Sequence, residues 1–383
     1  MTSEDSLNRV VNVHPLGGLI LVLILVPVLS GCWGSPSKNI SSTYDLKAIA
    51  IDPVTPTTLY VGTDGGGVFK STDGGSSWAP INNGLIDLKV TALAIDWVTP
   101  SRIYAGTENG GIFASLDYGE TWSSPIGQSA ITSIRAIVID RNFCPPTPPC
   151  RGVYLASQSS GVWRSADGGF TFSPFTDNLS NSAVTAMAIY PTLVPDQATS
   201  RLYIGTEGGG FFSRGVNPSI DAQWTEAIPG LKALTQEEVV SMAVNPQLAS
   251  ELYVGTSGGE AGSGGSGIYK STDSGITFNL SYDPKFKFTI YFVAPLIGPT
   301  TADLTLYAGS DGIVRSVDRG GFWCILWDCS TPSEILQPGL TAFAAADFMK
   351  TDIDHTTFYA ALFNRKIIKT TDGGQTWTTL GLQ

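Results

Sequence analysis

The chain has 383 residues, enough for two or three domains of ordinary size or for one large all-β domain. Charged residues make up only 14% of it and its formal net charge is −11, so it lacks the basic surface that nucleic-acid binding requires. Its two histidines, His14 and His355, argue against histidine-based catalytic triads and His-rich metal sites. We therefore expect no nucleic-acid partner, no metal and no cofactor.

The first feature along the chain is an apolar run over residues 16–29, LGGLILVLILVPVL. It is shorter than the ~20 residues of a comfortable transmembrane helix and fits the apolar core of a signal peptide. Ser30, Gly31 and Cys32 follow, which resembles a bacterial lipobox and implies cleavage before Cys32 and acylation of its thiol. An uncleaved anchor, or an ordinary signal peptide with a chance cysteine, is the alternative.

This interpretation divides the chain into a signal peptide (residues 1–31), a lipidated Cys32 with a flexible tether (32–44) and a folded domain (45–383). It places the exported protein in the bacterial cell envelope, lipid-anchored at the outer membrane or on the extracytoplasmic face of another membrane. Trp33, rather than an aspartate, after the lipidated cysteine resembles outer-membrane sorting.

The other four cysteines form two close pairs, Cys144 with Cys150 and Cys324 with Cys329. In an oxidising compartment we expect each pair to form a local disulfide. A zinc site is the alternative, but C-x2-C spacing and nearby histidines are both missing.

From Asp45 onward, one pattern repeats about every 48 residues. Each unit begins with an apolar strand, such as Ala48–Ile51 or Ala92–Ile95. A second strand with tyrosine in its second position follows, as LYVGT from Leu59 and in six later copies. A short third strand, such as Gly67–Lys70, comes next. Apolar runs of this kind are typical of strands buried on both faces.

The fourth part of each unit is a turn of the form S-x-D-x-G-x-(S/T)-(W/F), with glycines for positive φ and polar side chains for the turn amides. It occurs six times, and a degenerate copy spans Ser213–Trp224. Its aspartates are Asp73, Asp117, Asp167, Asp273, Asp318 and Asp372. The period predicts an all-β, seven-bladed β-propeller with four antiparallel strands per blade.

This turn resembles the Asp-box, or BNR, repeat of the sialidase-like superfamily, and the resemblance covers the chain from about Asp45 onward. It implies that the six aspartates are structural and lie away from the ligand face. The Arg-Ile-Pro motif of sialidases is missing here. Only Arg135 and Lys47 are cations that begin an innermost strand, and two cations do not make an arginine triad.

We therefore expect a protein that is not an enzyme. Glycosidases need two suitably spaced carboxylates, and such a pair remains an open alternative. Xyloglucan-cleaving hydrolases that resemble this chain use two propellers in chains about twice as long. Serine or cysteine catalysis would lack a histidine base, since His355 lies in a loop between a first and a second strand.

Acidic residues recur in the loops from second to third strands, which propeller wiring places on one face. We predict this as a candidate binding face formed by Asp64, Glu108, Glu207, Glu260 and Asp311, with Trp327 as an aromatic anchor. A solvated rim and a cation site are the alternatives for the acids. Cover for a blade edge is the alternative for Trp327. An acidic face would suit a partner with a basic surface.

The repeat arrangement is also similar to the photosystem II stability/assembly factor family, whose arginine-rich client patch has no match here. The resemblance implies a kind of role, not a client. We predict a monomeric, non-enzymatic, lipid-anchored scaffold that binds a protein partner. A glycan-binding module or a glycoside hydrolase is the alternative.

Overall fold

The computed structural model describes residues 43–124, 131–140, 152–190, 200–208, 210–216, 223–226, 238–245, 248, 250–257, 267–282, 292–297, 304–309, 313–325, 340–345, 357–362, 365–372 and 376–380. The chain divides into two compact units, Met1–Pro36 and Ser37–Gln383, and every described residue lies in the second. Within these ranges no helix is long and apolar enough to cross a membrane. The predicted signal peptide and Cys32 fall outside them.

The second unit consists of antiparallel sheets, each built from strands that follow one another in the chain. Six sheets have four strands each: β1 (Leu46–Ile51), β2 (Leu59–Thr63), β3 (Gly67–Ser71) and β4 (Ala79–Pro80); β8 (Ile134–Asp140), β9 (Gly152–Ser157), β10 (Gly161–Ser165) and β11 (Ser173–Pro174); β12 (Val184–Tyr190), β13 (Arg201–Thr206), β14 (Phe211–Gly215) and β15 (Thr225–Glu226); β16 (Glu238–Val244), β17 (Leu252–Ser257), β18 (Ile268–Ser271) and β19 (Asn279–Tyr282); β20 (Phe292–Ile297), β21 (Leu304–Gly309), β22 (Ile313–Ser316) and β23 (Cys324–Ile325); β24 (Leu340–Ala345), β25 (Phe358–Leu362), β26 (Ile367–Thr370) and β27 (Thr378–Leu380). One sheet has three strands: β5 (Val90–Ile95), β6 (Ile103–Thr107) and β7 (Ile112–Ser115).

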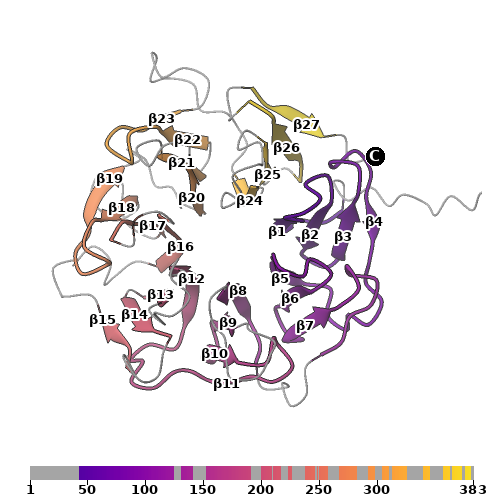
Figure 1. Ribbon diagram of the computed structural model, residues 1–383, viewed down its shortest axis with the longest axis horizontal. Coiled ribbons are helices and arrows are strands. Elements are labelled where there is room, and N and C mark those ends of the chain that lie inside the picture. Colours follow the sequence, from indigo (N-terminus) through magenta and orange to yellow (C-terminus); the bar gives the residue numbers. More distant parts are fainter. Residues whose placement is uncertain are drawn as a thin grey trace, which may run out of the picture. The chain divides into compact units, whose positions relative to one another are not determined.

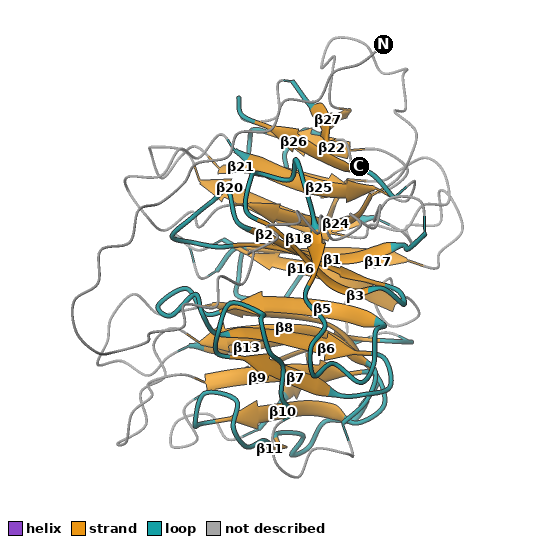
Figure 2. Ribbon diagram, turned by 90° about the vertical axis from the view of Figure 1, so that its right-hand side faces the viewer, coloured by secondary structure: helices purple, strands orange, loops and turns teal. Residues whose placement is uncertain are grey.

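The sheets are arranged in a ring, with the first strand of each sheet at the centre (Figure 1). Each first strand contacts the first strand of the next sheet, and β24 contacts β1, so the ring is closed. The side view in Figure 2 shows only strands and loops in the described part. Four-stranded antiparallel sheets packed around an axis form a β-propeller.

The described part of the chain has six four-stranded blades, not the seven that the repeat predicted. The difference lies after β7, where the chain makes one isolated bridge between Ala114 and Ser123 instead of a fourth strand. Both backbone hydrogen bonds of that bridge are 2.9 Å long. A single residue pair is too short to count as a strand, so this sheet stops at three.

The repeated tyrosine of the second strand is buried, and in Tyr60, Tyr104 and Tyr253 its hydroxyl donates to a turn of the next sheet. Its side chain is at most 1% exposed in six copies: Tyr60, Tyr104, Tyr154, Tyr203, Tyr253 and Tyr359. The Tyr104 hydroxyl donates to the Gly168 carbonyl over 2.7 Å, and the Tyr253 hydroxyl donates to the Arg319 carbonyl over 3.0 Å. Both acceptors directly follow the aspartate in a turn of the neighbouring sheet, so tyrosine and turn fit together across the sheet interface.

The second-strand glycine allows close approach between the same neighbours. A Cβ atom at Gly106 would lie 2.4 Å from Ile134 Cγ2, and one at Gly205 would lie 2.2 Å from Val239 Cγ1. Real Cβ atoms do not approach so closely, so the sheets could not pack in this way with a larger residue there.

The carboxylates of five of the six repeated turns accept the same hydrogen bonds, shown here for Asp117, whereas Asp318 accepts an amide but no hydroxyl from Phe322. The Asp117 carboxylate accepts from the Ser115 hydroxyl (2.7 Å), the Thr121 amide (2.9 Å) and the Thr121 hydroxyl (2.6 Å). The Ser115 hydroxyl in turn accepts from the Gly119 amide over 2.8 Å. These bonds from Thr121 and Ser115 lower the pKa of Asp117. In the first turn, burial alone would raise the pKa of Asp73, but hydrogen bonds from Ser77 and Ser71 lower it to about 2.

Candidate functional site

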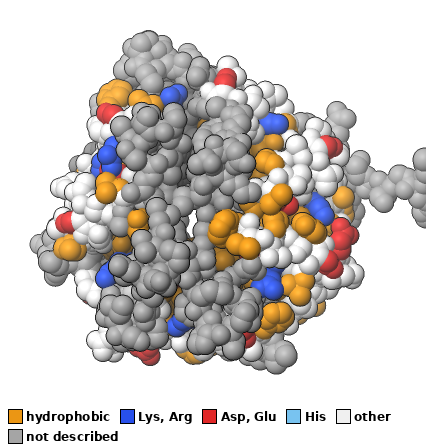
Figure 3. Space-filling model, viewed as in Figure 1, with side chains coloured by type: hydrophobic (Ala, Val, Ile, Leu, Met, Phe, Trp, Pro, Cys, Tyr) orange, Lys and Arg blue, Asp and Glu red, His pale blue; other side chains and the backbone are white. Residues whose placement is uncertain are grey.

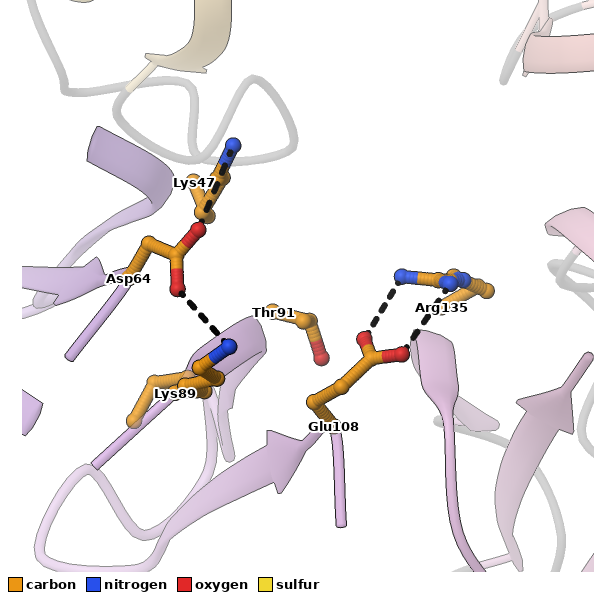
Figure 4. A pocket seen from close by; sticks show the side chains of 7 residues that line it. Lys47, Asp64, Lys89, Thr91, Glu108 and Arg135 are labelled. Carbon is orange, nitrogen blue, oxygen red and sulfur yellow. Dashed lines mark hydrogen bonds and ion pairs between the residues drawn. The ribbon is translucent and has the colours of Figure 1, made fainter. Parts of the chain in front are cut away.

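A pocket of about 330 Å³ opens where the first strands of three neighbouring sheets begin. Its lining is Lys47, Asp64, Lys89, Val90, Thr91, Glu108 and Arg135. Figure 4 shows Asp64 between the two lysines, Glu108 facing Arg135, and Thr91 between these two groups. Five of the seven lining residues are charged, which is unusual for a chain with so little charge.

Irregularities in two first strands direct the side chains of Lys47 and Arg135 into this pocket. The pairing of β1 with β2 skips Lys47, and the pairing of β8 with β9 skips Arg135. The same skip falls at Thr91 in β5 and Thr185 in β12. A bulge of this kind leaves one residue out of the ladder and turns its side chain in a new direction.

The side chain at the bulge determines whether the position bonds the next sheet or extends into the pocket. Thr185 donates to the Val239 carbonyl over 2.6 Å, and Thr91 donates to the Ile134 carbonyl, so each threonine links its own sheet to the next. Lysine and arginine are too long for this short bridge and extend into the pocket instead. The sequence signal is a polar residue between an apolar residue and alanine at the start of a first strand, as in Leu46–Ala48 and Ile134–Ala136.

Asp64 and Glu108 each follow a second strand directly, and neighbouring backbone holds both of them. The Asp64 amide donates to the Asp45 carbonyl (2.9 Å), and the Glu108 amide donates to the Lys89 carbonyl (3.0 Å). Asp64 lies 3.9 Å from the ammonium groups of both Lys47 and Lys89. These distances exceed ordinary hydrogen bonds, so the two lysines share one carboxylate at long range.

Arg135 is held much more tightly. Its NH1 group donates to Glu108 Oε2 over 2.9 Å, and its Nε donates to Gln158 Oε1 over 2.7 Å. Gln158 Nε2 donates on to Glu207 Oε2 over 2.5 Å. A chain of polar contacts therefore runs from the pocket to Glu207 in the next sheet, β12–β15.

Asp87 is a supporting residue that sequence reasoning missed. Its carboxylate accepts from the amides of Lys89 (3.0 Å), Asn109 (2.7 Å) and Gly110 (2.9 Å), so it joins the loop of Lys89 to the loop of Glu108. Burial would raise the pKa of Asp87, but these amides and the Thr107 hydroxyl lower it. An aspartate three residues before a first strand was the available sequence signal.

For the described residues of the predicted acidic face, the structure shows cations beside the acids. It brings Asp64 and Glu108 together, and Gln158 links Glu207 to them, but three cations face the first two acids. Among the described residues on the face shown in Figure 3, acidic and basic side chains lie in small separate groups. The pocket itself carries one more positive than negative charge.

The remaining predicted site residues fall elsewhere. Glu260, Asp311 and Trp327 lie outside the described residues, as do Cys32, Cys144, Cys150, Cys329 and both histidines. Only the backbone of Cys324 is placed, in β23, so neither disulfide is tested. The turn aspartates lie just after third strands, at the end of the sheets opposite the pocket. The described part contains no group of three or more His, Cys, Asp or Glu side chains that could hold a metal ion.

Comparison with known proteins gives the fold. No family model matches the chain, and no curated protein matches it. Among solved structures, it is similar to the GH74 xyloglucanase from Xanthomonas campestris (16% identity, TM-score 0.64), covering 89% of this chain and 54% of that one. It thus spans about half the length of that xyloglucanase.

Two further similar structures come from chains shorter than the xyloglucanase. YCF48 bound to D1 peptide has 14% identity and a TM-score of 0.56, covering 86% of this chain and 93% of that one. The WD40 repeats of RRP9 have 11% identity and a TM-score of 0.57, covering 84% and 88%. At these identities the likeness establishes a β-propeller and nothing finer.

Proposed function

We propose that this chain is a non-enzymatic binding or assembly scaffold of the bacterial cell envelope, which holds a protein partner at the end of the ring where the pocket opens. The observation that carries the proposal is the pocket, because bulged first strands and clamped loops fix its charged side chains on a rigid ring. Charged groups held this way favour recognition of a partner of matching charge.

The YCF48 structure supports the class of partner. That structure contains YCF48 bound to D1 peptide, so a ring of this fold can hold a segment of another protein. Nothing of that client is carried over to this chain, since only the fold is shared.

We further propose that the six repeated turns are Asp-box turns of the BNR type and that the three-stranded sheet is a seventh blade that lacks its outer strand. The shared hydrogen bonds of the turns and the position of β5–β7 within the ring support this.

Membrane attachment through Cys32 belongs to the same proposal, and the lipobox-like sequence supports it. Cys32→Ser should abolish labelling by a palmitate analogue and move the chain from the membrane fraction to the soluble one. A chain that stays in the membrane unlabelled would instead support an uncleaved anchor.

A glycan-binding module or glycoside hydrolase is the second candidate, because two carboxylates, Asp64 and Glu108, line one pocket and the fold is similar to about half of a GH74 xyloglucanase. Both carboxylates are engaged by cations, which is why we place it second. Release of reducing sugar from xyloglucan, lost in Glu108→Gln, would favour this candidate over the scaffold.

Site-specific photo-crosslinking of the full chain in its own membranes tests the scaffold directly. A crosslinker at position 89 samples the pocket rim, and one at position 120 samples an exposed turn at the opposite end. We expect a discrete protein adduct from position 89 and none from position 120. No adduct from either position, or the same adducts from both, would contradict the proposal.

A further inference from the structure

The strongest unassigned feature is a difference in charge pairing between the two halves of the pocket: one half has a close ion pair and the other has two lysines around one carboxylate. Arg135 is committed to Glu108 and Gln158, with hydrogen bonds of 2.9 Å and 2.7 Å. Lys47 and Lys89 share the single carboxylate of Asp64, each at 3.9 Å. Within the described residues, two ammonium groups thus face one distant carboxylate.

These two lysines are also accessible. The Lys47 and Lys89 side chains are 39% and 56% exposed, whereas those of Arg135 and Glu108 are 33% and 31% exposed. An incoming group can therefore reach the ammonium groups without breaking the tighter Arg135 pair. The two lysines come from separate segments on either side of Asp64, so they can contact one ligand together (Figure 4).

We propose that this half of the pocket binds a carboxylate of the partner protein, with the Lys47 and Lys89 ammonium groups as its direct contacts. The inference rests on the proposed scaffold function and assigns the chemistry of its partner. Charge-assisted hydrogen bonds from two ammonium groups suit a carboxylate, and a volume of about 330 Å³ admits a short acidic side chain or a chain terminus.

This assignment reverses the expectation of a basic partner. A basic segment would need free carboxylates, but Asp64 and Glu108 both face cations already. The whole chain has a net charge of −11 and would repel an acidic peptide in general. Acidic peptide binding by this protein therefore has to come from a local positive site.

Labelled hexapeptides provide the probes, titrated against the full chain in detergent. One is acetyl-Gly-Gly-Glu-Glu-Gly-Gly-amide, with side-chain carboxylates only. The second is acetylated hexaglycine with a free C-terminus, and the third is Gly-Gly-Gln-Gln-Gly-Gly blocked at both ends. We expect one or both of the first two to bind and the third not to. The one that binds more tightly identifies the source of the carboxylate.

Single substitutions should change the affinity for the acidic peptide in opposite directions. Lys47→Gln and Lys89→Gln should each weaken acidic-peptide binding by about tenfold, as expected for loss of one charged hydrogen bond. Asp64→Asn should strengthen it, because the lysines lose their shared internal carboxylate. Lys70→Gln is the matched control, since Lys70 contacts the turn at Tyr118 at the far end of the sheets. It should leave binding unchanged.

These outcomes distinguish failure of the carboxylate assignment from failure of the proposed scaffold function. If position 89 captures a partner but Lys47→Gln and Asp64→Asn leave that capture unchanged, and neither these two substitutions nor Lys89→Gln changes peptide binding, the carboxylate assignment is wrong and the scaffold stands. Stronger binding of a Gly-Gly-Lys-Lys-Gly-Gly peptide, weakened by Asp64→Asn, would overturn it in favour of a basic partner. If no partner is captured at all, the scaffold itself fails.

Discussion

Glu251 shows how a buried charge is tolerated at the scale of a single residue. Its side chain is 3% exposed and receives hydrogen bonds from three partners: Lys270 at 2.7 Å, Arg319 at 2.6 Å and Asn245 at 2.6 Å. Arg319 belongs to the next sheet, so the carboxylate joins two blades. A buried ion of this kind is stable only while its partners are all present.

Glu251→Gln should therefore lower the free energy of unfolding by roughly 3 kcal/mol at neutral pH, because Lys270 and Arg319 lose their counter-charge. Urea unfolding measures the change. Glu226→Gln, at an exposed position in β15, removes the same charge and should change stability by less than about 0.5 kcal/mol. Equal effects of the two substitutions would show that the Glu251 contacts add nothing.

The same residue predicts a pH dependence. Burial would raise the pKa of Glu251, but hydrogen bonds from Arg319, Lys270 and Asn245 lower it to about 2. Because the folded pKa is below the unfolded value of about 4.3, the contribution is complete above that value. It is lost as the pH falls towards about 2. The stability gap between the natural chain and Glu251→Gln should be constant from pH 7 to 5 and shrink steadily below pH 4.

At the scale of the element, the repeated turn can be separated into its hydrogen bonds. Asp117→Ala removes three acceptor contacts and should cost about 2 kcal/mol, whereas Thr121→Val removes one hydroxyl contact and should cost about 1 kcal/mol. Glu120→Gln changes only an exposed ion pair in the same turn and should cost less than about 0.5 kcal/mol. Thermal unfolding measures all three, and any other order would contradict this account of the turn.

The elements were largely predictable because they repeat. The tyrosine strand and the S-x-D turn have local causes, namely burial on both faces and hydrogen bonds within eight residues. Both patterns occur several times in the sequence, which makes them easy to recognise. Within the described residues, the lack of an outer strand after β7 was not predictable, because the turn from Ser115 to Trp122 is intact and only the pairing of Ser124 differs from that of a full blade.

The pocket was predictable only in part. The loop wiring placed Asp64 and Glu108 at one end of the ring, and Lys47 and Arg135 were identified as the cations nearest the channel. Their pairing depends on a bulge in each first strand and on contacts between sheets, such as that of Arg135 with Glu108, 27 residues away in the chain. Sequence spacing does not encode such contacts. Lys89, which completes the cation set, therefore carried no signal.

At the scale of the whole molecule, the way the ring closes distinguishes one junction from the others. The first sheet uses only β1–β4 and the last only β24–β27, so no strand is shared between the two ends. Among the described residues, side chains make contacts across this junction: Trp78 and Leu46 pack with Tyr359, and Arg365 Nε donates to Asp45 Oδ1 over 2.8 Å. At every other junction, the chain also runs covalently from one sheet into the next.

The closing junction should therefore open most readily, and hydrogen exchange can detect this. Amides of β25 and β26 should exchange faster than those of β9 and β10, which occupy equivalent strands of a blade joined covalently on both sides. Arg365→Gln should increase exchange in β25 and β26 by up to about fivefold, the effect of losing one partly exposed ion pair, and leave β9 and β10 unchanged. Glu120→Gln, which removes an ion pair far from this junction, is the control. Uniform protection around the ring would mean that side-chain packing alone makes the closing junction as stable as the covalent ones.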